Sequence, residues 1–125
     1  MYKNLSIKKN IKEDGALTLN APLGYVGVAK NYIENNYMNS DISVRNIASL
    51  LHINRAYLYR LFKIDVGVSV KEYIIKIRML NAKKLLKTGN TICETALLVG
   101  YKDAFVFSRA FKKYVGISPK EYKEK

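Results

Sequence analysis

An internal repeat is the feature that most constrains the fold of this 125-residue chain. Residues 59–73 read YRLFKIDVGVSVKEY and residues 108–122 read SRAFKKYVGISPKEY, so nine of fifteen positions are identical at a constant separation of 49 residues. Identity at this level indicates two copies of one structural unit, and not coincidence. We therefore expect a fold in which two similar units share one domain.

The spacing of apolar residues predicts that both units are helical. From Tyr25 onwards, apolar residues recur at intervals of three and four, which is typical of amphipathic α-helices. Residues that cap helix starts and glycines that end helices divide this region. The predicted helices cover about 25–38, Ser43 to Leu51, Asn54 to Gly67, Val70 to Lys87, Thr91 to Val99, Asp103 to Gly116, and a last short helix from Ser118-Pro119. The fold class is therefore all-α, with seven helices.

Residues 1–24 differ from the rest of the chain. They mix lysines and asparagines with Gly15, Pro22 and Gly24, and they show little helical periodicity. We interpret them as a linker, or as the remnant of an N-terminal domain absent from this chain. The helical domain is expected to span residues 25–125.

Each copy of the repeat ends a pair of short helices joined by a tight turn, which is the helix-turn-helix arrangement. Such a unit needs a small residue where its two helices nearly touch, and Ala48 and Ala96 occupy that position. It also needs a turn residue that can adopt a left-handed conformation. Gly100 meets this need in the second unit, and His52 takes the equivalent place in the first.

Charge and composition limit the classes of function. The net charge of +12 favours a polyanionic partner, which is DNA, RNA or an anionic membrane surface. With one cysteine, Cys93, and one histidine, His52, the sequence predicts no internal disulfide, no metal site and no cofactor, and it shows no constellation for catalysis. No membrane-spanning segment or signal peptide is expected, and a reducing cytoplasm fits the single cysteine.

The region from Asp41 to Tyr122 resembles the C-terminal domain of the AraC/XylS family of bacterial transcription regulators. The resemblance rests on IASLLHINRAYLYRLFK, on RMLNAKKLL in the long helix, and on TALLVGYKDAFVFSRAFKKYVGISPKEY. It departs from the family at two positions: His52 replaces the usual glycine of the first turn, and Thr95 replaces the usual isoleucine. Both departures are expected to loosen local packing without changing the fold.

The resemblance implies a fold and a function. It implies two helix-turn-helix subdomains joined by a long linker helix, with both recognition helices in adjacent major-groove segments of double-stranded DNA. It also implies regulation of transcription in bacteria, by activation with RNA polymerase as a partner, and location in the cytoplasm at the nucleoid. The KDAFVFSRAFKK stretch is most similar to regulators of sugar uptake genes. We expect this chain to be monomeric, while a parent protein can dimerise through an absent N-terminal domain.

The helical pattern also predicts the DNA-contacting residues. In residues 55–66, Leu58, Leu61 and Phe62 face inward, so the opposite face is available for base edges. The predicted base-facing residues are Arg55, Ala56, Tyr59 and Arg60, and the repeat adds Ala104, Phe105, Ser108 and Arg109. Predicted phosphate contacts are Lys63, Lys102 and Lys112, with the helix N-termini at Ser43 and Thr91.

The sequence is compatible with other roles for some of these residues. Arg60 or Arg109 can instead be a structural ion-pair partner of Asp65 or Glu94, and Phe105 can belong to the core. Lys63, Lys112 and the basic run on residues 70–87 can be solvated charges. A basic helical RNA-binding module is the alternative function.

Overall fold

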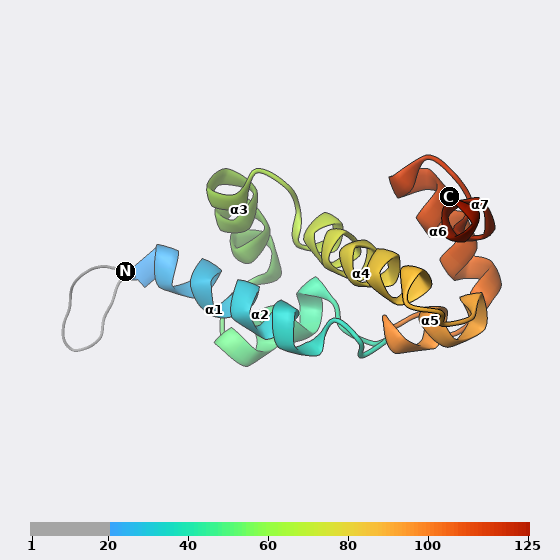
Figure 1. Cartoon of the computed structure of the whole chain (residues 1–125). Helices are drawn as coiled ribbons and strands as arrows, with labels where there is room; N and C mark the ends of the chain where they lie inside the picture. The colour runs from blue at the N-terminus through green and yellow to red at the C-terminus, as the bar shows by residue number, and fades with distance from the viewer. Residues whose placement is uncertain (1–20) are drawn as a thin grey trace. The chain divides into compact units, whose positions relative to one another are not determined.

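The computed structural model describes residues 21–125, and this range contains seven α-helices and no strand (Figure 1). The all-α prediction is confirmed. The helices are α1 (Ala21–Asn36), α2 (Val44–Leu51), α3 (Arg55–Val66), α4 (Val70–Lys87), α5 (Ile92–Leu98), α6 (Ala104–Val115) and α7 (Pro119–Glu124).

The sequence repeat is also a repeat of structure. Helices α3 and α6 each have 12 residues, and each follows an N-cap side chain that accepts backbone N–H groups, from Asn54 and Asp103 respectively. Each ends at a glycine with a left-handed backbone, Gly67 with φ +92° and Gly116 with φ +101°. The chain turns sharply there at little cost because glycine has no Cβ. The N-caps, the helix starts and the terminal glycines of the two units are each 49 residues apart, which is the separation of the sequence repeat.

Helix α1 begins at Ala21, which is earlier than the expected start near residue 25, and it ends at Asn36 and not near residue 38. The start was misplaced because Pro22 and Gly24 weaken a helical pattern in sequence. Proline is tolerated in the first turn of a helix, where its missing N–H has no intrahelical partner. The interpretation of residues 1–20 as a linker or domain remnant lies outside the described residues.

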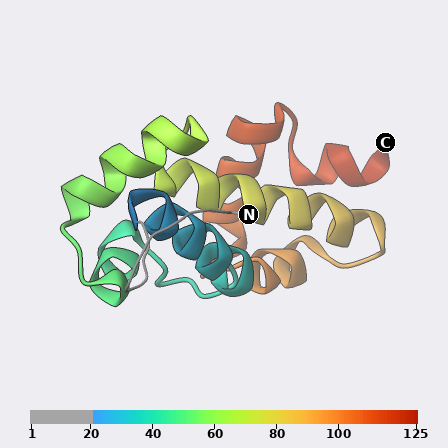
Figure 2. The same ribbon diagram turned by 90° about the vertical axis from the view of Figure 1, so that its left-hand side faces the viewer.

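The first of two compact units comprises most of α1 with α2 and α3 (Figure 2). Its buried apolar side chains come from all three helices and include Ile33, Ile47, Leu58 and Phe62. Helices α1 and α3 meet where the rings of Tyr25 and Tyr57 make an edge contact, with centroids 6.4 Å apart. The turn between α2 and α3 passes through His52 at φ +57°, so the predicted left-handed residue is confirmed.

The second unit contains α4 from Lys71 onwards, α5, α6, α7 and the segment 34–42. Its core joins side chains of α4, the α5 region and α6: Met79, Ala82, Leu86, Ala96, Val99, Phe107 and Phe111. Aromatic rings continue this core outwards from Phe111 to Tyr122 of α7, with centroids 5.6 Å apart. Thr95 is fully buried, and its hydroxyl donates a 2.8 Å hydrogen bond to the carbonyl oxygen of Thr91. The polar replacement at this position is therefore satisfied within its own helix.

The inward face of α4 differs in part from the prediction. The helical pattern of residues 70–87 predicts an inward position for Leu80, but Leu80 is 43% exposed, while its neighbour Met79 is fully buried. Leu85 is half-buried, and Leu86 carries the deeper contact. The stripe Met79–Ala82–Leu86 follows intervals of three and four, so Leu80 lies about 100° around the helix from it. The apolar character of leucine alone did not distinguish these positions.

Arg78 belongs to the basic run on α4 for which the sequence favours a solvated face, and for this residue that interpretation is wrong. Its guanidinium is buried and donates hydrogen bonds to the carbonyl oxygens of Tyr37, at 2.8 Å, and Asn39, at 2.9 Å. It also lies over the ring of Tyr101, 5.2 Å from the centroid. Burial lowers the pKa of Arg78, and the charge is offset by these acceptors. Within the second unit, Arg78 therefore fixes the segment after α1 to α4.

Candidate nucleic-acid interface

Helix α3 presents the predicted polar face. Leu58 and Phe62 are fully buried, and they fix which side of the helix meets the core. Leu61 is only half-buried, so the inward stripe is narrower than predicted. The opposite side is exposed at all five predicted contact residues: Arg55, Ala56, Tyr59, Arg60 and Lys63. The structure thus brings these side chains onto one exposed helix face.

An aromatic side chain supports the central arginine of this face. The guanidinium carbon of Arg60 lies 5.9 Å from the centroid of the Tyr57 ring. Tyr57 is itself half-buried and contacts Tyr25 of α1. Arg60 therefore lies against a ring that is anchored in the first unit, while its own side chain is exposed.

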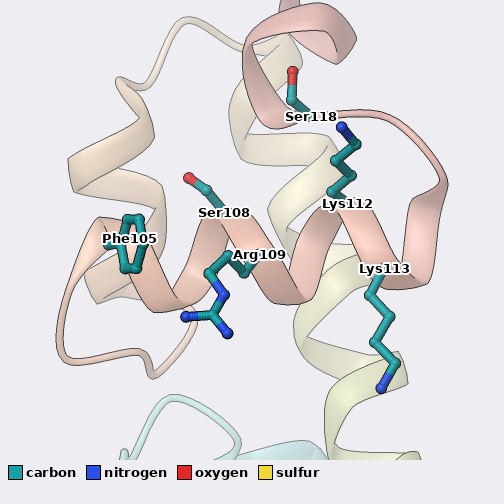
Figure 3. A pocket seen from close by; sticks show the side chains of 6 residues that line it. All are labelled: Phe105, Ser108, Arg109, Lys112, Lys113 and Ser118. Carbon is teal, nitrogen blue, oxygen red and sulfur yellow. The ribbon is translucent and has the colours of Figure 1, made fainter.

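Helix α6 carries an open groove that gathers several of the predicted residues (Figure 3). Its lining combines aromatic, hydroxyl and basic groups: Phe105, Ser108, Arg109, Lys112, Lys113 and Ser118. Phe105 is 70% exposed, so it does not belong to the core. Ala104, by contrast, is half-buried against the core of the second unit.

Two lining residues of this groove, Lys113 and Ser118, were not predicted. Lys113 follows Arg109 by four residues, so helical spacing places both on adjoining parts of the surface. Ser118 was recognised only as the start of the last helix, where its hydroxyl accepts the backbone N–H of Glu121 at 3.1 Å. Its place in the groove depends on how α7 packs against α6, which the pattern did not show.

The side chain of Arg109 lies against Phe105. Its guanidinium carbon is 5.4 Å from the centroid of the Phe105 ring, one helical turn earlier. Among residues 21–125, neither Arg109 nor Arg60 forms an ion pair, so the structural role considered for them with Asp65 or Glu94 is not observed. Both arginines keep donors available for a ligand.

Capping boxes occupy the N-termini predicted to bind phosphate. At α2, the Ser43 hydroxyl accepts the N–H of Asn46 at 3.3 Å, and the N–H of Ser43 donates to Asn46 Oδ1 at 2.7 Å. At α5, the same pair of bonds joins Thr91 to Glu94, at 3.0 and 2.8 Å. Glu94 brings a carboxylate to this helix end. The two N-termini therefore differ in charge, and that of α2 is the better match for an anion.

The predicted phosphate-contacting lysines are exposed. Lys63 and Lys112 lie in the second half of their helices, where they extend the basic face beyond the arginines. Lys102 lies 3.8 Å from the carboxylate of Asp41, but both side chains are more than 70% exposed, so this ion pair is weak. It does not prevent Lys102 from binding another anion.

A metal-binding cluster and a membrane-spanning helix are both absent from the part of the chain that the structure describes. Within residues 21–125, no cluster of three or more histidine, cysteine or acidic side chains is placed to hold a metal ion. None of the helices in this range is long and apolar enough to cross a membrane.

Comparison with known proteins agrees with this geometry. Residues 47–125 match a family described as a helix-turn-helix domain. The raffinose operon transcriptional regulatory protein of Pediococcus pentosaceus is 38% identical over 98 residues, which are 78% of this chain and 35% of that protein. The lactose operon transcription activator of Staphylococcus xylosus is 42% identical over 96 residues, which are 76% of this chain and 34% of that protein. The chain thus spans about a third of the length of these relatives.

Among solved structures, the chain is similar to the C-terminal domain of AraT, a response regulator from Geobacillus stearothermophilus. The two share 37% sequence identity with a TM-score of 0.79, over 80% of this chain and 84% of that one. The repeated helix pairs, the family match and this likeness all lead to the same assignment. The chain belongs to the AraC/XylS family of helix-turn-helix transcription regulators.

Proposed function

We propose that this chain binds double-stranded DNA sequence-specifically, with α3 and α6 as recognition helices, and so regulates transcription in bacteria. The observation that carries the proposal is the exposed arginine repeated at one position of two structurally equivalent helices, Arg60 and Arg109. A recognition helix enters the major groove and contacts base edges there. With two such helices, the chain can contact base edges at two places, and we call each recognition helix a reader.

The exposed faces hold groups suited to base edges. Arg55, Arg60 and Arg109 can each donate two hydrogen bonds to O6 and N7 of guanine. Tyr59 and Ser108 can bond base edges or phosphate, and the methyl of Ala56 can contact a thymine methyl. Ala104 and Ser108 are both half-buried, and Ala104 contributes least because its side chain has no hydrogen-bonding group. The first helix therefore offers more hydrogen-bonding groups to the bases than the second.

The phosphate contacts follow the same division. Lys63 and Lys112 lie beyond the arginines on their helices, and Lys102 lies in the turn before α6. The N–H groups at the start of α2, near Ser43, add an uncharged contact. Thr91 is the weakest of the proposed phosphate contacts because the carboxylate of Glu94 caps the same helix end.

The wider role follows from the relatives. Proteins similar to this chain are described as regulators of the raffinose and lactose operons, and the latter as an activator. We infer that the target genes are sugar-utilisation genes and that the outcome is activation, with RNA polymerase as the protein partner at the nucleoid. The chain itself acts as a monomer on DNA, and dimerisation of a longer parent protein would use an N-terminal domain outside this chain.

Competition binding tests the proposal against an RNA-binding role. The chain is titrated into a labelled pool of duplex DNA enriched by selection from random sequence, with unselected duplex and structured RNA as competitors at equal salt. We expect the selected duplex to be bound at least a thousandfold more tightly than either competitor, the lower end of the usual ratio of specific to non-specific DNA binding. If structured RNA or unselected duplex is bound as tightly as the selected duplex, the proposal is wrong.

A further inference from the structure

The second recognition helix carries a feature that its counterpart lacks. Phe105, the second residue of α6, is 70% exposed, and the equivalent position in α3 is Ala56. A phenylalanine left in water forgoes the stabilisation that its burial would give. Because Phe107 and Phe111 already fill the core from this helix, the scaffold does not use the Phe105 ring.

The ring of Phe105 instead supports Arg109. The guanidinium carbon of Arg109 lies 5.4 Å from its centroid, within the range of a cation–π contact. Both side chains line the groove on α6, and they extend from the same side of the helix (Figure 3). This contact restricts the position of the guanidinium while leaving its N–H donors available. In α3 the ring that contacts the arginine is that of Tyr57, which is half-buried. Of the two helices, α6 is therefore the one whose arginine contacts an exposed ring.

The spacing of base pairs in DNA would allow Phe105 and Arg109 to contact two neighbouring base pairs. An arginine that bonds O6 and N7 of guanine lies in the plane of that base. Successive base pairs are about 3.4 Å apart along each strand. The Phe105 ring centroid lies 5.4 Å from the guanidinium carbon, so with Arg109 in the plane of a guanine the ring reaches the edge of the next base pair. The only apolar group that the natural bases present there is the 5-methyl group of thymine.

We propose that Phe105 and Arg109 act as one two-part reader for a guanine and a 5-methylpyrimidine in the adjacent base pair. Arg109 bonds the guanine, and Phe105 contacts the methyl group while holding the guanidinium in the guanine plane. The inference rests on the proposed function, since it requires α6 to enter the major groove. It makes Phe105 a specificity-determining residue, although its ring has no hydrogen-bonding group.

Base analogues test the methyl contact directly. In a selected duplex, each thymine in a base pair next to a guanine is replaced in turn by deoxyuridine, which removes only the methyl group. We expect one such replacement to weaken wild-type binding roughly three- to fivefold, the effect of exposing one methyl group. Replacing the same T·A pair by C·G and then by 5-methylcytosine·G should recover a similar factor. If 5-methylcytosine restores nothing, the site recognises another property of thymine and the methyl-reader proposal is wrong.

Two variants separate the roles of the ring. Phe105→Ala should bind the thymine and deoxyuridine duplexes equally and should lose about two- to fivefold of its preference for the neighbouring guanine, the usual range for an exposed cation–π contact. Phe105→Leu should keep part of the methyl preference, because leucine is apolar, but lose the same guanine preference. Circular dichroism melts should match wild type because the ring is exposed. A Phe105→Ala chain that still prefers thymine over deoxyuridine would overturn the reader.

Failure of the inference is distinguishable from failure of the proposed function. If wild type tolerates deoxyuridine at every position but Arg109→Ala still relaxes one guanine, Phe105 is not a reader while α6 remains a recognition helix. If Arg109→Ala changes no base preference, α6 reads no bases, and both the inference and the assignment of this helix are wrong.

Discussion

Gly100, just after α5, lies against another segment of the chain. It has φ +106°, and a Cβ at this position would lie 2.5 Å from the carbonyl oxygen of Tyr37 and 2.9 Å from Nε of Arg78. Gly100→Ala should lower the free energy of unfolding by about 2–5 kcal/mol, since it combines backbone strain with overpacking. Urea denaturation monitored by circular dichroism measures this loss.

Gly116 is a matched control for this prediction. It has a similar φ of +101°, but a Cβ there would meet nothing within 4 Å. Gly116→Ala should therefore cost only the strain, about 1–2 kcal/mol. Equal losses for the two variants would show that the close approach at Gly100 does not constrain the fold.

Tyr73 should make stability depend on alkaline pH. Burial, with a 3.0 Å hydrogen bond from its hydroxyl to the carboxylate of Glu34, raises the pKa of Tyr73 from 10.0 to about 12. The folded state thus holds the phenol proton more tightly than the unfolded state. The contribution, up to about 2–3 kcal/mol, is present below pH 10 and is lost as pH rises towards 12. Between pH 9 and 12, the free energy of unfolding should fall less steeply with pH for Tyr73→Phe than for wild type. An equal pH dependence for the two proteins would contradict this.

At the scale of elements, α6 separates support from recognition along one helix. Phe111 is fully buried in the core of the second unit, whereas Phe105 is 70% exposed. Phe111→Ala should destabilise the chain by about 3–5 kcal/mol. Phe105→Ala, the same substitution on the same helix, should change stability by less than about 0.5 kcal/mol. Urea denaturation of both variants checks the assignment of faces, and a reversed order would mean that α6 is turned about its axis.

The predictability of each element depended on whether its signals were local. The bounds of α3 and α6 followed from Asn54, Asp103 and the glycines that end both helices, because caps act within a few residues. The start of α1 was missed because proline in a first turn leaves no periodic pattern. The burial of Arg78 was missed for a different reason: its acceptors, the carbonyls of Tyr37 and Asn39, are distant in sequence and meet it only in the fold.

The candidate site shows the same division. Exposure of Arg60 and Arg109 followed from the inward positions of their helices, so sequence was sufficient for them. Phe105 was undecided, because an aromatic residue in a helix start fits both a core and a contact surface. Its contact with Arg109 is local in sequence. Its exposure depends on the tertiary packing, because Phe107 and Phe111 occupy the core on the inner side of the same helix.

For the molecule as a whole, the charge of +12 should appear as a salt dependence of DNA binding. Each phosphate neutralised by a lysine or arginine lowers the slope of log affinity against log salt by about 0.9. Lys112→Ala should therefore reduce the magnitude of the slope by about one and weaken all duplexes alike. Lys30→Ala, on α1 and outside both recognition helices, should leave the slope unchanged. A slope that Lys112→Ala does not alter would remove this residue from the phosphate contacts.

Binding-site selection on variants tests most directly whether α3 and α6 of one chain contact bases independently. Random duplex pools are selected with wild type, Arg60→Ala and Arg109→Ala. Wild type should select two short, dissimilar elements about one helical turn, ~10 base pairs, apart, without the palindrome of a symmetric dimer. Arg60→Ala should relax preference in one element and Arg109→Ala in the other, each at a cost of about 1–3 kcal/mol on the wild-type site. If both variants degrade the same bases, or neither changes the selected sequence, the two-reader account is wrong.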